Sequence, residues 1–411
     1  MAHPEADAVG ELPTATPPAR GLLPLLFVAN AAMYALYTGI GGVLLPLQIE
    51  HIDAASKVAN LGIVGGVAAV FATVFNPVAG ALSDRSGRRN PWILGGGLAA
   101  IAAMALLGSV HTVLLVAIGW CLGQAVMNIY QAALTSVVPD RIPRERRGIA
   151  SAAVGLGLPI GSTIGVLVAS VCSDHYRTGY LILGVLVAVA AVVFTTGSRE
   201  VRQPPRPSTP LRAQAAAFLN VLREHDFRWA FTGRALLVLG YFSVTGYQLY
   251  ILQDHISLPS GLEPARAVAI LTPISAVAMA ISTVVGGVAS DRLNRRKPFV
   301  AAAATLAAVA LMIPVFSPSW PAMIVFAAVN GLAFGCFMAV DTALVTMVLP
   351  KAEDAARDMG VLNIANAAPQ IVGPFVASAV VSLGGYPPLF LVGGALSILG
   401  ALAVAPIRSV R

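Results

Sequence analysis

The stretch "GALSDRSGRRNPW" (residues 80–92) places four charged side chains in a chain that is almost purely apolar on either side. These are Asp84, Arg85, Arg88 and Arg89. Residues 287–299, "GVASDRLNRRKPF", nearly repeat it, with Asp84 and Asp291 standing 207 positions apart. A charged turn that occurs twice between apolar stretches indicates a chain built from two related halves.

The composition indicates that most of the chain lies in a lipid bilayer. Of 411 residues, 57% are hydrophobic and 11% are charged, whereas soluble domains carry about 25% charged residues. A soluble protein of this length could not cover its surface with so little charge. We interpret the net charge of +7 as basic loops beside the bilayer, and nucleic acid is not an expected partner.

The apolar stretches number twelve, and each is close to the roughly 20 residues that span a bilayer. Helices are predicted because a chain in lipid must satisfy its own backbone hydrogen bonds, and the alternation of a membrane β-barrel is missing from these stretches. The sequence therefore predicts an all-α membrane protein. The expected limits are 22–48, 58–83, 91–109, 112–138, 148–172, 178–196, 229–253, 265–290, 297–315, 320–349, 358–382 and 386–406.

The basic residues predict the orientation of the chain. With the N-terminus inside, cytoplasmic segments hold 22 of the 26 Lys and Arg residues. Outer loops hold three (Lys57, Arg177 and Arg266), and Arg234 lies within a helix. This asymmetry follows the positive-inside rule, and one missed helix would invert it. We expect a multi-pass protein of the plasma (inner) membrane with both termini in the cytoplasm.

A polar segment divides the chain. Residues 197–228 contain "PPRPSTP", whose prolines exclude a continuous helix. We interpret this segment as a cytoplasmic linker between two six-helix bundles, residues 22–196 and 229–406. Residues 1–21 and 407–411 are expected to be cytoplasmic tails. The repeat in register predicts that the two bundles are pseudo-symmetric.

These features resemble the major facilitator superfamily. Its signature between the second and third helices, G-x-L-[AS]-D-R-x-G-R-[RK], matches residues 80–89 at every specified position, whereas the second copy has Asn294 in place of the glycine. The resemblance implies twelve helices in two bundles and transport by alternating access. "RRNPW" and "RRKPF" are also similar to the sucrose and glycoside-transporting branches. The embedded Arg usual in the fourth helix of drug–proton antiporters is missing from 112–138.

The repeated turn is a candidate conformational latch. Asp84 could pair with Arg88, or with the positive end of a helix from the other half. The resemblance implies that Asp84 closes the cytoplasmic side against the eleventh helix. A solvated turn that only sets topology is the alternative. The latch residues would be Asp84, Arg85, Arg88, Arg89, Asp291, Arg292 and Arg295.

Polar side chains recur on single faces of four predicted helices, at spacings of 3, 4, 7 and 11. Such groups are costly in lipid and should face a cavity or a partner. The resemblance implies that helices one, four, seven and ten line a central cavity. The candidates are Asn30, Tyr34, Tyr37, Gln124, Asn128, Gln131, Tyr241, Gln248 and Asn330, with Asn363 and Asn366 of the eleventh helix lining the cavity or bonding the tenth.

Asp341 is a carboxylate well inside a predicted span. Facing a narrow cavity, it could bind and release a proton during transport. Arg234 is a possible partner, or an arginine that reaches toward the interface. Contact with the substrate and a purely structural role for Asp341 remain alternatives.

Secondary transport of a small polar solute, driven by protons, is the favoured function. Amide and Tyr groups with few charges favour a sugar-like solute. Drug or metabolite efflux by proton antiport is the alternative, and a non-transporting sensor is a third. Neither a catalytic cluster, a metal site nor a nucleotide-binding loop is evident, so we expect no enzyme activity and no cofactor. A monomer is expected.

Overall fold

The computed structural model describes residues 21–143, 146–200, 202, 223–293, 295–348 and 355–408, which are almost entirely helical. The predicted tails up to residue 20 and from 409 onward, and residues 201 and 203–222 of the predicted linker, lie outside these ranges. The helices are α1 (Leu22–Gly39), the π-helix η1 (Ile40–Leu44), α2 (Leu45–Ile52), α3 (Lys57–Ser86), α4 (Asn90–Ser109), α5 (Val113–Arg141), α6 (Arg147–Val171), the short 3₁₀ helix η3 (Ser173–His175), α7 (Tyr176–Gly197), α9 (His225–Thr245), α10 (Gln248–Asp254), α11 (Pro264–Leu293), α12 (Lys297–Phe316), α13 (Trp320–Val348), α14 (Ala355–Gly384) and α15 (Tyr386–Ala403).

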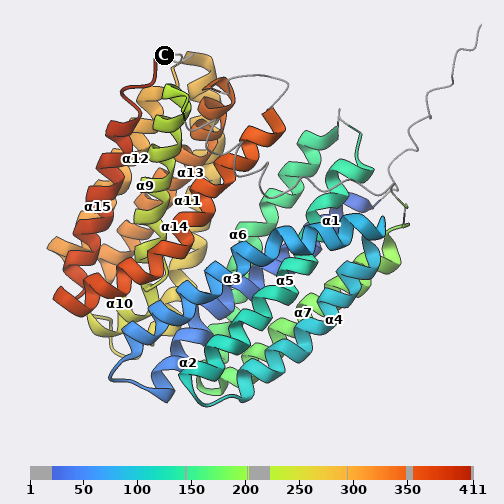
Figure 1. The fold of residues 1–411 in the computed structure, drawn as a ribbon. Coiled ribbons are helices and arrows are strands. Elements are labelled where there is room, and N and C mark those ends of the chain that lie inside the picture. The colour runs from blue at the N-terminus through green and yellow to red at the C-terminus, as the bar shows by residue number, and fades with distance from the viewer. Residues whose placement is uncertain are drawn as a thin grey trace, which may run out of the picture.

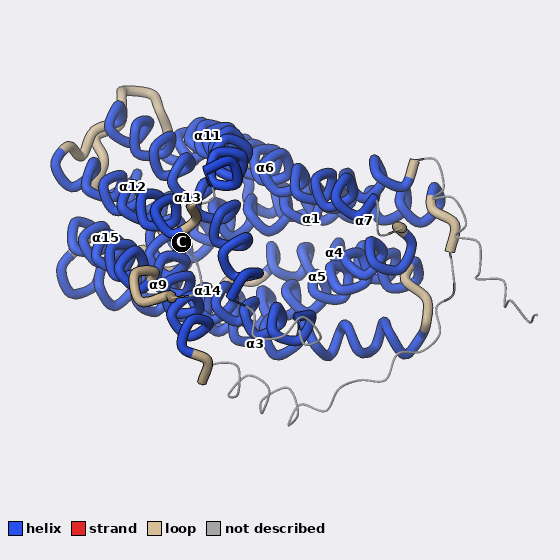
Figure 2. The backbone as a smooth tube through the Cα atoms, turned by 90° about the horizontal axis from the view of Figure 1, so that it is seen from above, coloured by secondary structure: helices blue, strands red, loops and turns tan. Residues whose placement is uncertain are grey.

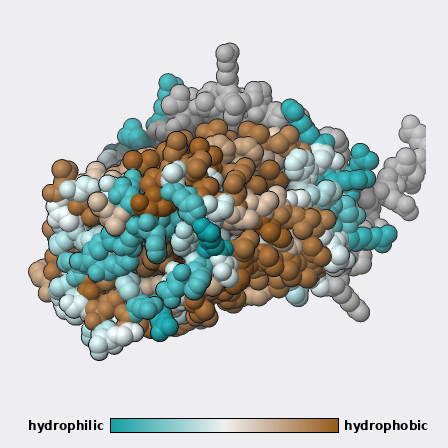
Figure 3. Space-filling model, turned by 90° about the horizontal axis from the view of Figure 1, so that it is seen from below, coloured by the Kyte–Doolittle hydropathy of each residue, from teal (hydrophilic) through white to brown (hydrophobic). Residues whose placement is uncertain are grey.

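The described helices form twelve membrane spans when two interrupted helices are each counted once. The run α1–η1–α2 is one of eleven continuous spans, and α9 with α10 forms a pair bent by 48°. Side chains on the outside are apolar, as at Val171, 78% exposed, and Val74, 68% exposed. Figure 3, seen from below, shows hydrophobic surface flanking a hydrophilic area. The predicted all-α membrane fold is therefore confirmed.

Two bundles make up the molecule (Figure 1): α1–α7 in blue and green, and α9–α15 in yellow to red. Their internal repeat is visible in the helix limits. The helices α11, α12 and α13 each begin and end 207 positions after α3, α4 and α5, as from Lys57 to Pro264 and from Ser86 to Leu293. The offset read from the charged turn thus holds for three consecutive helices.

The charged turn is built by local stop and start signals. Gly87 ends α3 with a φ of 63°, and its N–H donates to the Asp84 carbonyl. Glycine adopts this left-handed conformation without the cost that a Cβ brings. Pro91 occupies the first turn of α4, where its missing N–H costs no hydrogen bond. Asn90 and Gly87 are thus only three residues apart, and the turn is tight.

The bundles meet along α3 with α14 and along α6 with α11, pairs that lie side by side in Figures 1 and 2. Toward the ends of α3 and α15 the bundles diverge in Figure 1, whereas they come together near α2 and α10. We call the side of the Gly87 turn the basic side and that of α2 and α10 the far side. At the α3–α14 contact, a Cβ on Gly66 would lie 2.2 Å from Phe375.

Candidate functional site

A cavity of about 440 Å³ lies between the two bundles. Both interrupted helices border it, at η1 and at the α9–α10 bend. Interruptions of this kind are frequent at functional sites because they expose groups that a regular helix would hide. The lining residues are Tyr37, Thr38, Gly41, Gly42, Leu158, Pro159, Ser162, Val166, Tyr241, Phe242, Thr245, Gly246, Gln248, Val268, Thr272, Ser275, Ala276, Met279, Phe326, Asn330, Gly331 and Phe334.

Aromatic rings form one wall of the cavity. Tyr241 of α9 stacks on Phe334 of α13, with ring centroids 3.9 Å apart and planes 17° apart. Phe242 meets Tyr241 edge to face at 5.3 Å. Such a pair presents a broad apolar surface with a phenol group beside it. Among the residues that the structure describes, those that line the cavity include no charged side chain.

Four of the predicted cavity residues line this cavity: Tyr37, Tyr241, Gln248 and Asn330. Tyr37 also donates a long hydrogen bond, 3.4 Å, to Gln131. The signal missed in the sequence is a face of α11 that carries hydroxyl groups, including Thr272 and Ser275. The spacing of these hydroxyl groups along α11 can be seen in the sequence. Small hydroxyls can, however, also hydrogen-bond a carbonyl of their own helix, as Thr272 does by donating to the Val268 carbonyl.

The remaining predicted residues are not among the lining residues, and several have other partners. Asn30 is buried and donates to the Leu26 carbonyl. Asn128 donates to the Gln124 carbonyl and accepts from Asn76 of α3. Tyr34 is half-buried in α1, and the side chain of Asn363 lies outside the described residues. Asn30 and Asn128 thus hydrogen-bond within a helix or between helices rather than line the cavity.

A buried ion pair lies within the second bundle. Arg234 of α9 donates from Nη1 to Asp341 Oδ2 of α13 at 2.9 Å, and their side chains are 6% and 4% exposed. The Nε of Arg234 also donates to Asn366 Oδ1 of α14 at 2.8 Å. The structure thus places Arg234, Asp341 and Asn366 together, across three helices. Burial of such charges is costly unless they remain paired.

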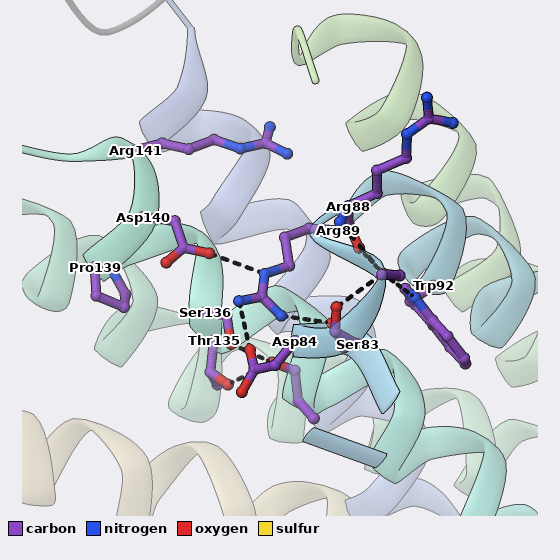
Figure 4. A network of polar contacts seen from close by, with 12 residues as sticks. Ser83, Asp84, Arg88, Arg89, Trp92, Thr135, Ser136, Pro139, Asp140 and Arg141 are labelled. Atoms are coloured by element: carbon purple, nitrogen blue, oxygen red, sulfur yellow. Dashed lines mark hydrogen bonds and ion pairs between the residues drawn. The ribbon is translucent and has the colours of Figure 1, made fainter. Parts of the chain in front are cut away.

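The charged turn forms a second network (Figure 4). Arg89 donates to Asp84 at 2.6 Å and to Asp140 of α5 at 2.9 Å, and also to Ser83. Burial by itself would lower the pKa of the Arg89 guanidinium, but its hydrogen bonds to the two carboxylates outweigh this and raise that pKa. Arg88 points away and is exposed. Asp84 therefore pairs with Arg89, not with Arg88.

Glu200 fixes the start of α4 from the end of the first bundle. Its carboxylate accepts from the backbone N–H groups of Arg89 and Asn90, at 3.2 and 2.7 Å. Arg141, at the end of α5, donates to Glu200 at 2.9 Å and to Asn90. A carboxylate at a helix N-terminus is favourable because the unpaired N–H groups there carry partial positive charge.

The second copy of the turn is more exposed. Asp291 pairs with Arg296 at 3.0 Å, the same five-residue spacing as Asp84 and Arg89. The Asp291 side chain is 65% exposed. The side chains of Arg85, Arg292 and Arg295 are also exposed. An exposed ion pair contributes little to stability. The second copy of the turn should therefore stabilise the protein less than the first.

Replacing Arg89 with methionine should destabilise the protein by about 3 kcal/mol, because it removes the guanidinium from the fully buried Asp140 side chain. Replacing the adjacent, exposed Arg88 with methionine should change stability by less than about 0.5 kcal/mol. Thermal unfolding of both variants in detergent measures the difference. Equal losses would show that the Arg89 contacts contribute no more than an exposed charge.

The far side holds a third network, and this one joins the bundles. Lys57 of α3 donates to Glu50 at 2.8 Å and to Asp254 of α10 at 2.9 Å. Its ammonium group lies 4.8 Å from the centre of the Tyr250 ring. Gln253 donates to Glu50 across the same boundary. Among the described residues, Lys57 and Asp254 form an ion pair between the two bundles, whereas the ion pairs of the basic side each lie within one bundle.

Metal-binding clusters of three or more His, Cys, Asp or Glu are not found in the part of the chain that the structure describes. Cys121, Cys172 and Cys336 are free thiols. The three networks consist mainly of charged and amide groups that bind one another. The cavity is thus the feature suited to hold a small molecule.

Comparisons with known proteins agree with this architecture. The sequence profile of the Major Facilitator Superfamily matches residues 26–263 and 261–410. The chain is 24% identical over 347 residues to the MFS transporter asaE of Aspergillus flavus, which covers 81% of this chain and 75% of that protein. It is 24% identical over 168 residues to the multi-drug resistance efflux pump PmrA of Streptococcus pneumoniae, covering 39% of this chain and 41% of the pump.

Solved structures share the fold. A bacterial homologue of the human lysosomal transporter Spinster, in an inward-facing and unoccupied conformation, aligns with a TM-score of 0.71 and 15% identity over 95% of this chain and 96% of that one. A POT peptide transporter aligns with a TM-score of 0.77 and 15% identity over 95% of each chain. With the family profile matching nearly the whole chain, this protein belongs to the Major Facilitator Superfamily and is a multi-pass membrane transporter, not an enzyme.

Proposed function

We propose that this transporter exports a small, uncharged, amphipathic aromatic solute by alternating access, in exchange for protons. The observation that carries the proposal is the cavity lining, which combines aromatic and aliphatic surface with amides and hydroxyls and, in the part of the chain that the structure describes, includes no charged side chain. A flat solute can stack on the Tyr241 side of the cavity, while Gln248 and Asn330 hydrogen-bond its polar end. Partial similarity to an efflux pump supports export.

A sugar-like solute is the second candidate. The amides of Gln248 and Asn330 and the phenols of Tyr37 and Tyr241 favour it. A polyhydroxy solute needs many hydrogen-bonding partners, however. Because Gln124 and Asn128 are not among the lining residues, the cavity offers fewer of these than the sequence predicts, and we rank the aromatic solute first.

Proton exchange is assigned to Asp341. Its carboxylate is buried in a transporter domain and is held by Arg234. Protonation would neutralise one member of the pair and weaken the contact, so Arg234 would be held mainly by its hydrogen bond to Asn366 of α14. Because α14 also contacts α3 of the other bundle, this is a physical connection between proton binding and the arrangement of the bundles.

The structure corresponds to an inward-facing form if the basic side is cytoplasmic, as the distribution of Lys and Arg predicts. This orientation places both termini in the cytoplasm, and we propose the plasma membrane as the location. When the basic side closes, Asp84 would exchange Arg89 for the N-terminal end of α14 and act as the latch. We further propose that the protein works as a monomer.

The substrate class can be tested with purified protein in thermal-shift assays and in liposomes with a pH gradient. We expect the neutral aromatic solutes chromone, flavone and chloramphenicol to raise the unfolding temperature, and sucrose and lactose to leave it unchanged. A proton gradient should drive the aromatic solutes against their own gradient. Stabilisation by the sugars but not by the aromatic solutes would replace this proposal with the second candidate.

Replacing Phe334 with alanine should weaken binding of the aromatic solutes about 3- to 10-fold, because an aromatic contact is worth about 0.5–1.5 kcal/mol. Phe316, which is 84% exposed at the end of α12, provides the control. Its replacement by alanine should leave affinity unchanged in the same titration. Equal affinities for both variants would contradict a stacking role for the Tyr241–Phe334 pair.

A further inference from the structure

Two glycines of the π-helix η1 form a bare part of the cavity wall. Gly41 and Gly42 line the cavity and are partly exposed, whereas the neighbouring Ile40 and Val43 are fully buried. A Cβ added at either glycine would meet no atom within 4 Å. Their missing side chains therefore leave open space on the cavity side of the helix.

Some other helical glycines of the first bundle have a packing reason, whereas Gly80, Gly95, Gly148 and Gly155 have none but do not line the cavity. A Cβ on Gly161 would lie 2.2 Å from the Ala31 carbonyl oxygen, and one on Gly165 would lie 2.0 Å from that of Ala35. These glycines let α6 approach α1 closely. Gly331 also lines the cavity, but a Cβ there would lie 2.5 Å from the Ser275 carbonyl oxygen. Packing thus explains glycine at these positions and not at Gly41 or Gly42.

Backbone conformation does not require glycine at these two positions either. Positive φ among the described glycines occurs at Gly21, Gly87, Gly261 and Gly385, none of which lies in η1. Glycine inside a helix costs up to about 1 kcal/mol relative to alanine. Neither packing nor a positive φ requires glycine at positions 41 and 42. Because both glycines lie at the edge of the cavity, their main physical effect is to enlarge it.

We propose that Gly41 and Gly42 determine the size of the solute that the cavity accepts, by letting its bulk approach the backbone of η1. This inference rests on the proposed function, since it concerns the same cavity and the same class of neutral aromatic solute. Side chains at 41 or 42 would project into the cavity and exclude the larger solutes first. Small solutes would still reach the aromatic wall at Tyr241.

Chromone and flavone test this directly, because flavone is chromone with one added phenyl ring. We expect Gly42→Val to weaken flavone binding about 10-fold or more and to change chromone binding by less than about 3-fold. Stability should be kept, since a Cβ at position 42 has no neighbouring atom within 4 Å. Gly165→Ala is the matched control, and it should lower the unfolding temperature because it forces α6 away from α1. Equal loss of both solutes, or no loss of either, would overturn the size role.

A labelling experiment tests the position of the glycines without any solute. With Cys121, Cys172 and Cys336 replaced by serine, Gly42→Cys should react with N-ethylmaleimide, whereas Gly165→Cys should not. An unreactive cysteine at 42 would overturn the inference even if the aromatic solutes bind.

The same variant separates this inference from the proposed function. If Gly42→Cys reacts but the wild-type protein binds neither chromone nor flavone, the proposed solute class is wrong, whereas the open space at Gly42 is confirmed. The maleimide adduct at 42 should then still reduce binding of whichever solute stabilises the wild type, and unchanged binding would overturn the size role.

Discussion

Replacing Asp341 with asparagine should abolish proton-driven accumulation of solute while leaving solute exchange without a gradient intact. The amide keeps the shape of the carboxylate and can accept the hydrogen bond from Arg234, but it cannot bind and release a proton. Asp341 lies only 2.9 Å from Arg234, with both side chains almost fully buried. Uptake driven by a pH gradient in liposomes should fall to the level of empty vesicles, whereas counterflow should persist.

The control for this prediction is a carboxylate of the same chain outside the buried pair. Asp291→Asn changes a side chain that is 65% exposed, and it should preserve gradient-driven transport. A second control separates coupling from stability. Asp341→Asn leaves the Arg234 charge buried, at a cost of up to about 3–5 kcal/mol, and adding Arg234→Gln should recover stability but not coupling. Recovery of gradient-driven transport in the double variant would show that the pair is structural.

Replacing Lys57 with methionine should open the far side of the transporter. The ammonium group holds Glu50 of its own bundle and Asp254 of the other, and it lies over Tyr250. Methionine keeps much of the side-chain length but removes the charge, so the carboxylates repel each other with no cation between them. Raising the free energy of the closed state by about 1.4 kcal/mol changes the ratio of closed to open molecules about tenfold.

Accessibility of a cysteine at position 42 measures this shift. A membrane-impermeant maleimide applied to the far side of sealed vesicles should label Gly42→Cys roughly tenfold faster when Lys57 is methionine. Arg177 provides the matched control, since it lies on the same side but contacts His111 of its own bundle. Arg177→Met should leave the labelling rate unchanged. Identical rates for Lys57→Met and the unmodified background would exclude a closing role for Lys57.

Some residues of the site could be predicted from the sequence, and others could not. Tyr241, Gln248 and Asn330 line the cavity because a polar face on an apolar helix must meet either a cavity or a partner. The same rule holds for Asn30 and Asn128, but these side chains form hydrogen bonds instead, with the Leu26 carbonyl and with Asn76. Helical periodicity gives the face of a residue. It does not say whether that face meets an empty space or another helix.

The sequence by itself determined the membrane spans, the two repeated bundles and the tight turn, because these follow from hydrophobic length, from the 207-residue offset and from the glycine and proline that end and start helices. Only the tertiary structure decided the partners. Arg88 and Arg89 are adjacent and alike, yet one is exposed and the other reaches Asp140, 51 positions away. Pairing across helices depends on where separate elements come to rest in space, and no local pattern encodes that distance. The bare wall at Gly42 is a property of the same kind, since an empty volume belongs to all the helices that surround it.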